Sequence, residues 1–123
     1  MLHSKRDQSR MERQLSSSLT DACETAKAEI TGFTWLTHEV DYNRFPQSLQ
    51  VTWIFSTEAQ KGRAIAEGLD ARMQTLTRAA LDDVGIDMGT VIDPVRFDSE
   101  EACKRADGGD WKRRLARSAT TRH

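Results

Sequence analysis

Strict two-residue alternation between residues 33 and 56 constrains the fold of this chain more than any other feature. Two arms alternate large with polar side chains on either side of a short polar segment, 43–48, which contains Pro46. Residues two positions apart lie on the same face of a strand, so a face of large residues indicates a buried side. The pattern predicts a β-hairpin in which Tyr42 pairs with Leu49 and Leu36 pairs with Phe55. Its core face would hold Leu36, His38, Val40, Tyr42, Leu49, Val51, Trp53 and Phe55.

The opposite face of this hairpin carries a second group of large apolar side chains. Alternation places Phe33, Trp35 and Ile54 there, followed by polar residues toward the loop. Clustered apolar side chains on an uncovered face mark contact surfaces, and small domains often bury them against a symmetric copy. We therefore predict a homodimer whose interface contains Phe33, Trp35 and Ile54. The alternative is that the N- or C-terminal segment of the same chain folds over them.

Helical periodicity appears on both sides of the hairpin. Apolar residues at three- and four-residue spacing predict one helix from about residue 9 to 30 and another from about 58 to 84. Gly32 and Gly85 follow these helices and suit their C-terminal caps. A third strand is expected over 90–97, then a short helix to residue 105 capped by Asp98 or Ser99, and a final basic turn or two around Trp111.

This order of elements predicts a small α+β domain. The helix-strand-strand-helix-strand order, with a short C-terminal helix, favours a two-layer sandwich with two long helices on one face of a three-stranded sheet. A crossover through a helix would set the third strand parallel to the second, and we place it beside the first. Residues 9–115 would form this single domain, and residues 1–8 and 116–123 would be flexible tails.

Charge is unevenly distributed although the net charge is only −1. Residues 102–123 carry a net +5 and residues 1–14 a net +2, so the segment 15–101 carries −8. Basic termini favour contact with the phosphates of nucleic acid, and the alternative is solvated tails that balance the acidic middle. Trp111 would either stack on a base or anchor the tail to the domain. The candidate nucleic-acid contacts are Lys104, Arg105, Lys112, Arg113 and Arg114.

The residue types that perform catalysis or bind metals do not form the patterns that such chemistry needs. His38-Glu39 lacks the second histidine of a zinc H-E-x-x-H motif, and we interpret His38 as a hydrogen-bonded core residue. No base can be placed beside Cys23 or Cys103. The adjacent carboxylates Asp82-Asp83 would point about 100° apart on a helix. We therefore expect a non-enzymatic protein with no cofactor and no metal.

The sequence also bears on localisation. No apolar run approaches the roughly 20 residues that cross a bilayer, and the N-terminus lacks the apolar segment of a signal peptide. Two cysteines that are far apart in such a chain are most simply reduced thiols. We expect a cytoplasmic protein.

One segment matches the pattern of a known family. The sequence Thr-Arg-Ala-Ala-Leu at 77–81, followed by Gly85-Ile86 and Gly89-Thr90, resembles the helix-turn-helix of the Fis family of bacterial DNA-binding proteins. The rest of the chain resembles short bacterial proteins that sometimes carry a Fis-family label. The resemblance implies a DNA-binding transcriptional regulator whose recognition helix begins at Gly89. Beyond Thr90 the sequence departs from that pattern, because Pro94 would break a helix.

Three functions follow from the sequence, in order of preference. The first is a small non-enzymatic binding module that contacts a macromolecular partner, either nucleic acid or protein. The second is a Fis-like DNA-binding regulator, and the third is an enzyme whose site has no recognisable motif.

Overall fold

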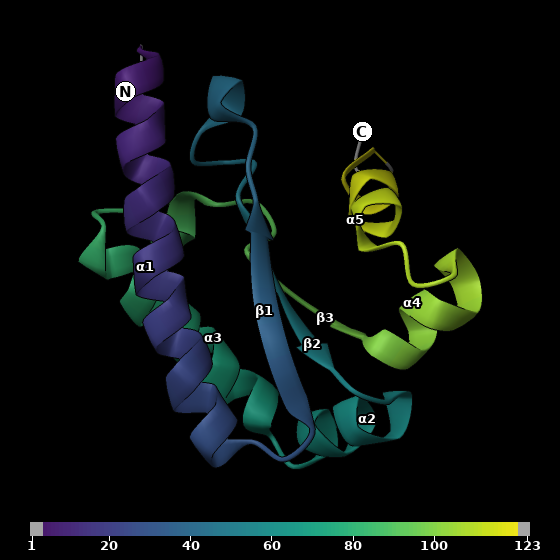
Figure 1. Ribbon diagram of the computed structural model, residues 1–123. Coiled ribbons are helices and arrows are strands. Elements are labelled where there is room, and N and C mark those ends of the chain that lie inside the picture. The colour runs from purple at the N-terminus through teal and green to yellow at the C-terminus, as the bar shows by residue number, and fades with distance from the viewer. Residues whose placement is uncertain (1–3, 121–123) are drawn as a thin grey trace.

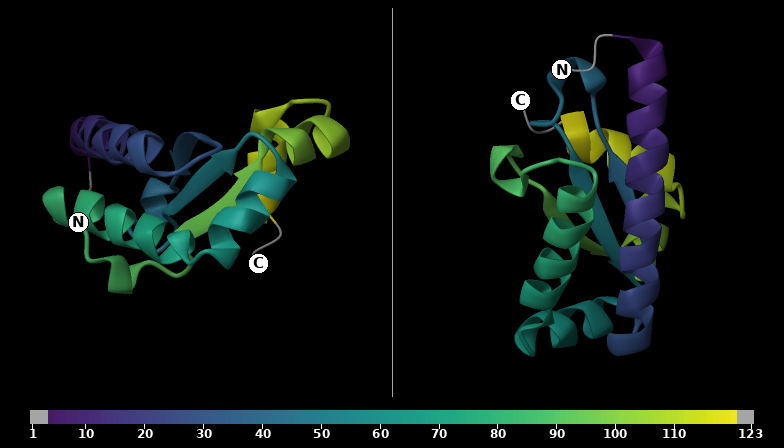
Figure 2. Two further views of the ribbon diagram at one scale, coloured as in Figure 1. Left: turned by 90° about the horizontal axis from the view of Figure 1, so that it is seen from below. Right: turned by 90° about the vertical axis from the view of Figure 1, so that its left-hand side faces the viewer.

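The computed structural model describes residues 4–120, which form five α-helices around a three-stranded sheet (Figure 1). Helices α1 and α3 pack side by side on one face of the sheet, and α4 and α5 lie on the opposite side (Figures 1 and 2). The predicted α+β class, with two long helices on one face, is therefore confirmed. No helix within this part of the chain is long and apolar enough to cross a membrane. The elements in order are α1 (Lys5–Glu29), β1 (Phe33–Glu39), η1 (Tyr42–Arg44), β2 (Gln50–Phe55), α2 (Glu58–Ala66), α3 (Leu69–Asp83), η2 (Met88–Thr90), β3 (Val95–Ser99), α4 (Glu100–Asp107) and α5 (Trp111–Thr120).

Strand β2 occupies the centre of the sheet. It pairs antiparallel with β1 and parallel with β3, so the predicted placement of the third strand beside the first is wrong. All six residues of β2 are buried, whereas most residues of β1 and β3 are half-buried. A strand buried on both faces has its place in the middle of a sheet, with a neighbour along each edge. Leu36 pairs with Trp53, two residues away from the predicted register, and this even shift preserves the core face.

A β-bulge at Thr34 changes the face on which Phe33 lies. The register shifts between Phe33 and Trp35, so Phe33 pairs with Phe55. An extra residue in one strand reverses the alternation on one side of it. Phe33 is therefore buried on the core face, with its ring centroid 5.0 Å from that of Trp53. The prediction that Phe33 shares the outer face with Trp35 and Ile54 is wrong.

The main core lies between β2 and the pair α1–α3. Leu15 and Leu19 of α1 meet Trp53 of β2 and Met73 of α3, and all four are buried. The indole nitrogen of Trp53 donates a hydrogen bond of 3.1 Å to Thr77 Oγ1. A buried indole N–H needs such a partner, and the bond places α3 against the central strand.

The predicted helix over 58–84 is two helices. Helix α2 ends at Ala66 and α3 begins at Leu69, with Gly68 between them in the left-handed conformation at φ 81°. Glycine adopts this conformation without the steric cost that a Cβ adds. The break turns α2 toward the end of the sheet, where it packs against β2 and β3 (Figure 1).

Residues 84–99, all of which the structure describes, contain no second helix of a helix-turn-helix. Met88–Thr90 form a single 3-10 turn, capped by Asp87, whose carboxylate accepts a bond from the Gly89 N–H. The chain then extends into β3, and the Pro94 carbonyl accepts a 2.7 Å bond from the Val51 N–H. The sequence resemblance therefore does not extend to the structure of this segment.

Both ends of the domain are more helical than predicted. Ser4 caps α1 by accepting a bond from the Asp7 N–H, so residues 5–8 are helical, and α5 continues through Thr120. Helices α1 and α5 thus extend into residues 5–8 and 116–120, which the sequence analysis assigned to flexible tails. The predicted tail residues 1–3 and 121–123 lie outside the described part of the chain.

Gly32 and Gly68 form a matched pair for testing how closely α2 packs on the sheet. Both have positive φ, at 86° and 81°. A Cβ on Gly32 would lie 2.7 Å from the Gln60 Cβ, whereas a Cβ on Gly68 would meet nothing within 4 Å. Gly68→Ala should cost roughly 1–2 kcal/mol of unfolding free energy from the backbone alone. Gly32→Ala should cost clearly more in urea denaturation, and equal losses would contradict this packing.

Candidate nucleic-acid interface on the C-terminal helices

The predicted basic residues lie on two short helices that pack against each other. Lys104 and Arg105 are on α4, and Lys112, Arg113 and Arg114 are on α5. Residues 108–110 link the helices through two left-handed glycines. Ser99 Oγ accepts a 3.0 Å bond from the Ala102 N–H, and Asp110 Oδ1 accepts a 3.0 Å bond from the Arg113 N–H. Side-chain caps of this kind fix where each helix begins.

One carboxylate joins α5 to β1. Glu100 accepts hydrogen bonds from the indole nitrogens of Trp35 and Trp111, the latter at 3.2 Å. The two rings meet edge to face, with centroids 5.3 Å apart. We call these three residues the indole–carboxylate cluster. It gives Trp111 the anchoring role, which was one of the two alternatives from the sequence.

The outer face of the sheet is covered by the chain's own C-terminal helices. Trp35 and Ile54 both lie on this face, as predicted, and they pair across β1 and β2, where the predicted partner of Ile54 was Thr37. Ile54 is fully buried, and Trp35 is half-buried beside Trp111. The alternative that the C-terminal segment folds over these residues therefore describes the structure. The surface on which the sequence placed a dimer contact is an internal contact of the folded chain.

Arg114 points inward, unlike its basic neighbours. Its Nε and Nη2 donate bonds of 2.7 and 3.0 Å to the Asp98 carboxylate, and its Nη1 donates a 2.9 Å bond to Asp107 Oδ2. The hydrogen bond to Asp98 raises the pKa of the Arg114 guanidinium above its ordinary value. Arg114 thus ties α5 to β3 and α4, and the predicted phosphate contact at this position has a structural role instead.

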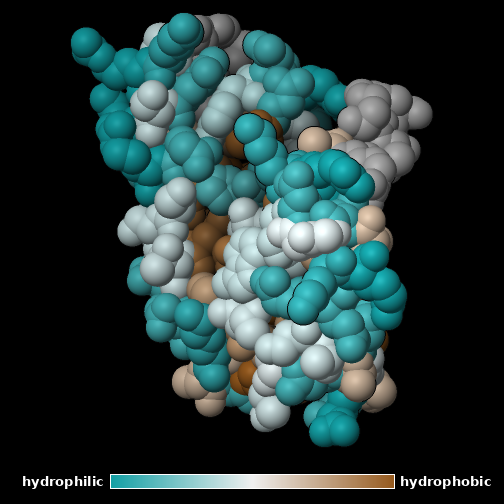
Figure 3. Space-filling view, turned by 45° about the vertical axis from the view of Figure 1, so that its right-hand side comes forward, coloured by the Kyte–Doolittle hydropathy of each residue, from teal (hydrophilic) through white to brown (hydrophobic). Residues whose placement is uncertain are grey.

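The other four basic side chains are exposed, and we call them the C-terminal basic surface: Lys104, Arg105, Lys112 and Arg113. Two carboxylates near this surface, Glu100 and Glu101, accept hydrogen bonds from groups outside it. Glu100 accepts from two indoles, and Glu101 Oε1 accepts a 2.9 Å bond from the Glu58 N–H. Arg113 lies 3.5 Å from Asp107 yet keeps 62% of its side chain exposed. Figure 3, turned toward this side of the molecule, shows a largely hydrophilic surface with hydrophobic atoms at the base of a narrow furrow.

A second polar cluster joins α1 to the hairpin. His38 Nε2 lies 2.8 Å from Glu12 Oε2, and the Tyr42 hydroxyl donates a 2.8 Å bond to Glu12 Oε1. Burial and the Glu12 carboxylate raise the pKa of Tyr42. His38 therefore has a polar partner, as predicted, but it is half-buried and lines a groove, so its predicted place in the core is wrong. Its partner Glu12 lies 26 positions away in sequence, and no local pattern indicates the pair.

This cluster lies at one end of a groove between α1 and β1, with a volume of about 390 Å³. The base of the groove contains Leu19, Cys23 and Leu36, and its rim is polar. We call it the α1–β1 groove. The residues that line it are Glu12, Ser16, Leu19, Thr20, Cys23, Leu36, Thr37 and His38.

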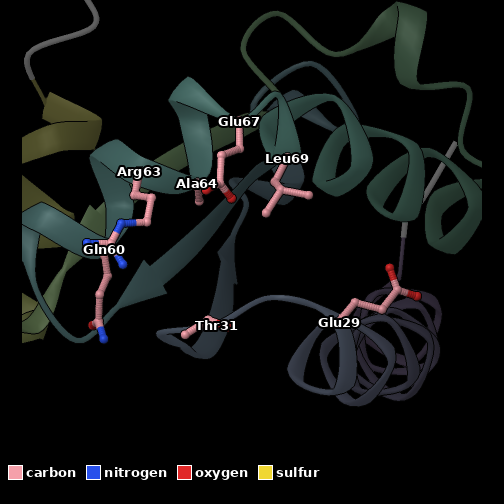
Figure 4. A pocket seen from close by; sticks show the side chains of 7 residues that line it. All are labelled: Glu29, Thr31, Gln60, Arg63, Ala64, Glu67 and Leu69. Atoms are coloured by element: carbon pink, nitrogen blue, oxygen red, sulfur yellow. The ribbon is translucent and has the colours of Figure 1, made fainter.

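A smaller pocket lies between the end of α1, the helix α2 and the start of α3 (Figure 4). Its volume is about 110 Å³, well below the roughly 300 Å³ at which small-molecule sites begin. On its wall, Glu29 forms a two-bond ion pair with Arg72 at 2.8 and 2.9 Å, which lowers the pKa of Glu29. The pocket is therefore too small for a typical ligand, and the ion pair on its wall joins α1 to α3. The side chains drawn in Figure 4 are Glu29, Thr31, Gln60, Arg63, Ala64, Glu67 and Leu69.

The thiols and carboxylates do not form a reactive centre in the described part of the chain. Cys23 and Cys103 are both buried free thiols, and burial raises the pKa of Cys103, which disfavours the nucleophilic thiolate. Within residues 4–120, no three His, Cys, Asp or Glu side chains lie together as a metal site would require.

Arg113 and Arg114 offer a matched test of which arginine supports the fold. Arg114→Ala should lower the unfolding free energy by roughly 3–5 kcal/mol, because it removes the guanidinium from a fully buried Asp107 carboxylate. Arg113→Ala should cost clearly less, about 1 kcal/mol or below, because its contact with Asp107 is longer, at 3.5 Å, and its side chain is mostly exposed. Urea denaturation followed by circular dichroism measures both. Similar values for the two variants would contradict the structural role of Arg114.

Comparisons with known proteins found no match for this chain: no family model, no curated protein and no solved structure.

Proposed function

We propose that this protein is a non-enzymatic binding module that contacts nucleic acid through the C-terminal basic surface. The observation that carries this proposal is the separation of charge on α4 and α5. Four cations are exposed there against two exposed carboxylates, Glu101 and Asp110, whereas Asp98 and Asp107 bind Arg114, and Glu100 binds two indoles. A surface that presents more cations than carboxylates attracts a polyanion although the net charge of the whole chain is −1.

The contacts that anchor α5 also support binding. Arg114 and the indole–carboxylate cluster fix α5 against β1 and β3 before any partner arrives. Ordering a mobile segment on association reduces affinity by up to roughly 1.5 kcal/mol for each flexible side chain that becomes fixed. A surface on anchored helices avoids the additional cost of ordering the backbone.

The expected mode of recognition is contact with phosphates. Lys and Arg side chains that bind phosphate set affinity and orientation but do not read sequence. Trp111, the aromatic residue beside the basic surface, already donates its indole N–H to Glu100 and packs on Trp35. Base stacking on this ring would have to compete with those contacts. We therefore propose sequence-tolerant binding.

A Fis-like regulator and an enzyme receive less support from the geometry. The segment 84–99 that would hold a recognition helix forms a 3-10 turn and a strand. The described thiols are buried, and His38 is bound to Glu12.

Fluorescence anisotropy with labelled single-stranded RNA tests the proposal across a series of salt concentrations. Four phosphate contacts predict a slope of about −2.8 in log K against log salt, at about 0.7 per contact. Replacing Lys104, Arg105, Lys112 and Arg113 together by Ala should remove most of this slope and weaken binding at least tenfold in low salt. Duplex DNA of the same length, measured in parallel, determines whether the surface prefers one strand or two.

The matched control replaces the four exposed basic residues of α1, which are Lys5, Arg6, Arg10 and Arg13. This variant loses the same charge at a different place, so its affinity should stay within about twofold of wild type if the C-terminal surface is the site. Equal losses in both variants would indicate a general charge effect and contradict the proposal. The absence of RNA and DNA binding at low salt would also contradict it.

A further inference from the structure

Strand β1 has an open edge. Among residues 4–120, β1 pairs with β2 on one side and with no strand on the other. Figure 1 shows β1 as the outermost strand of the sheet. Strand β3, at the opposite end of the sheet, has α2 packed against it. An exposed strand edge presents a row of backbone N–H and C=O groups that can pair with another strand.

The surface beside this edge is partly apolar. The α1–β1 groove runs along β1, and its base contains Leu19, Cys23 and Leu36. A strand added to β1 would gain ladder hydrogen bonds and would also cover these side chains. The outer face around Trp35 and Ile54 offers no such site, because α4 and α5 cover it.

We propose that two copies of this chain pair their β1 strands antiparallel along this edge and form one continuous sheet. A two-fold axis makes each residue of one strand face its symmetry partner in the other, and the contact closes on itself. This dimer differs from the one predicted by sequence, because it uses the edge of the sheet and not its face. It is independent of the proposed nucleic-acid binding.

The bulge and the charge pattern determine the register of the pairing. The bulge at Thr34 leaves residues 35–39 as the regular part of β1, and the centre of that part is Thr37. In an antiparallel dimer centred on Thr37, Trp35 faces Glu39 of the other copy, and Leu36 faces His38. In a parallel arrangement Glu39 would face Glu39, and directly opposed like charges destabilise a sheet. The charge of the strand therefore favours the antiparallel, two-fold arrangement.

A dimer in which the α1 helices beside the paired strands also contact each other would have enough surface for a stable contact. Helix α1 has 25 residues and so extends over about 37 Å. A strip of that length and about 15 Å in width, the width of a helix beside a strand, would bury on the order of 1,100 Å² in total. Specific interfaces begin near 1,000 Å².

Sedimentation velocity over a range of protein concentrations tests this dimer. Wild type should show a concentration-dependent dimer. Thr37→Lys should raise its dissociation constant at least tenfold, because two ammonium groups would meet at the two-fold axis. The control Thr75→Lys adds the same charge on an exposed position of α3 and should leave the dissociation constant unchanged. A wild type that stays monomeric at every concentration, or a dimer that Thr37→Lys does not weaken, would overturn the proposal.

A cross-linking variant tests the same register without weakening the contact. Thr37→Cys should form an intermolecular disulfide under mild oxidation, because the two side chains at the axis face each other within bridging distance. The native thiols, Cys23 and Cys103, are buried, so Thr75→Cys provides a matched background for non-reducing electrophoresis. Cross-linking of Thr37→Cys no faster than that of Thr75→Cys would overturn the register.

Discussion

The burial of β2 on both of its faces is the constraint on which the rest of this structure depends. Trp53 and Phe55 point to one side and Ile54 to the other, and all three are fully buried. Each side therefore needs a cover. Helices α1 and α3 supply the larger core, and α4 and α5 supply the smaller cover. Helices α4 and α5 are short, with 8 and 10 residues. The charge-assisted hydrogen bonds of Glu100 and Arg114 help to hold them on the sheet.

The sequence predicted most of the elements, because period-two and period-3.6 patterns are local and the core depends on them. It did not predict the break at Gly68, because Gly62, which is also in a helical pattern, remains within α2. It missed the bulge at Thr34, because threonine is an ordinary strand residue and one extra residue leaves no compositional mark. The order of the strands depends on which strand is buried on both faces. Ile54, an apolar residue on the outer face of β2, indicated this double burial. A single apolar residue there is equally consistent with a contact surface between molecules.

In the candidate site too, contacts between residues far apart in the sequence could not be predicted. The basic residues of the C-terminal helices are visible in the sequence, but the inward direction of Arg114 is not. Its partners Asp98 and Asp107 are 16 and 7 positions away, and only the fold brings them to one guanidinium. Similarly, the sequence left two roles open for Trp111, stacking on a base or anchoring the tail, because its partner Trp35 is on a strand 76 positions earlier. Long-range pairs of this kind decide which members of a basic cluster remain exposed.

The three tryptophans lie in two different environments, so their intrinsic fluorescence can report on two parts of the molecule. Trp53 is buried in the main core, whereas Trp35 and Trp111 share one carboxylate at the margin of the sheet. Detachment of α5 alone would hydrate two indoles and leave the third in its apolar surroundings. Emission at long and short wavelengths would then separate the loosening of the outer layer from the melting of the whole domain, with no added dye.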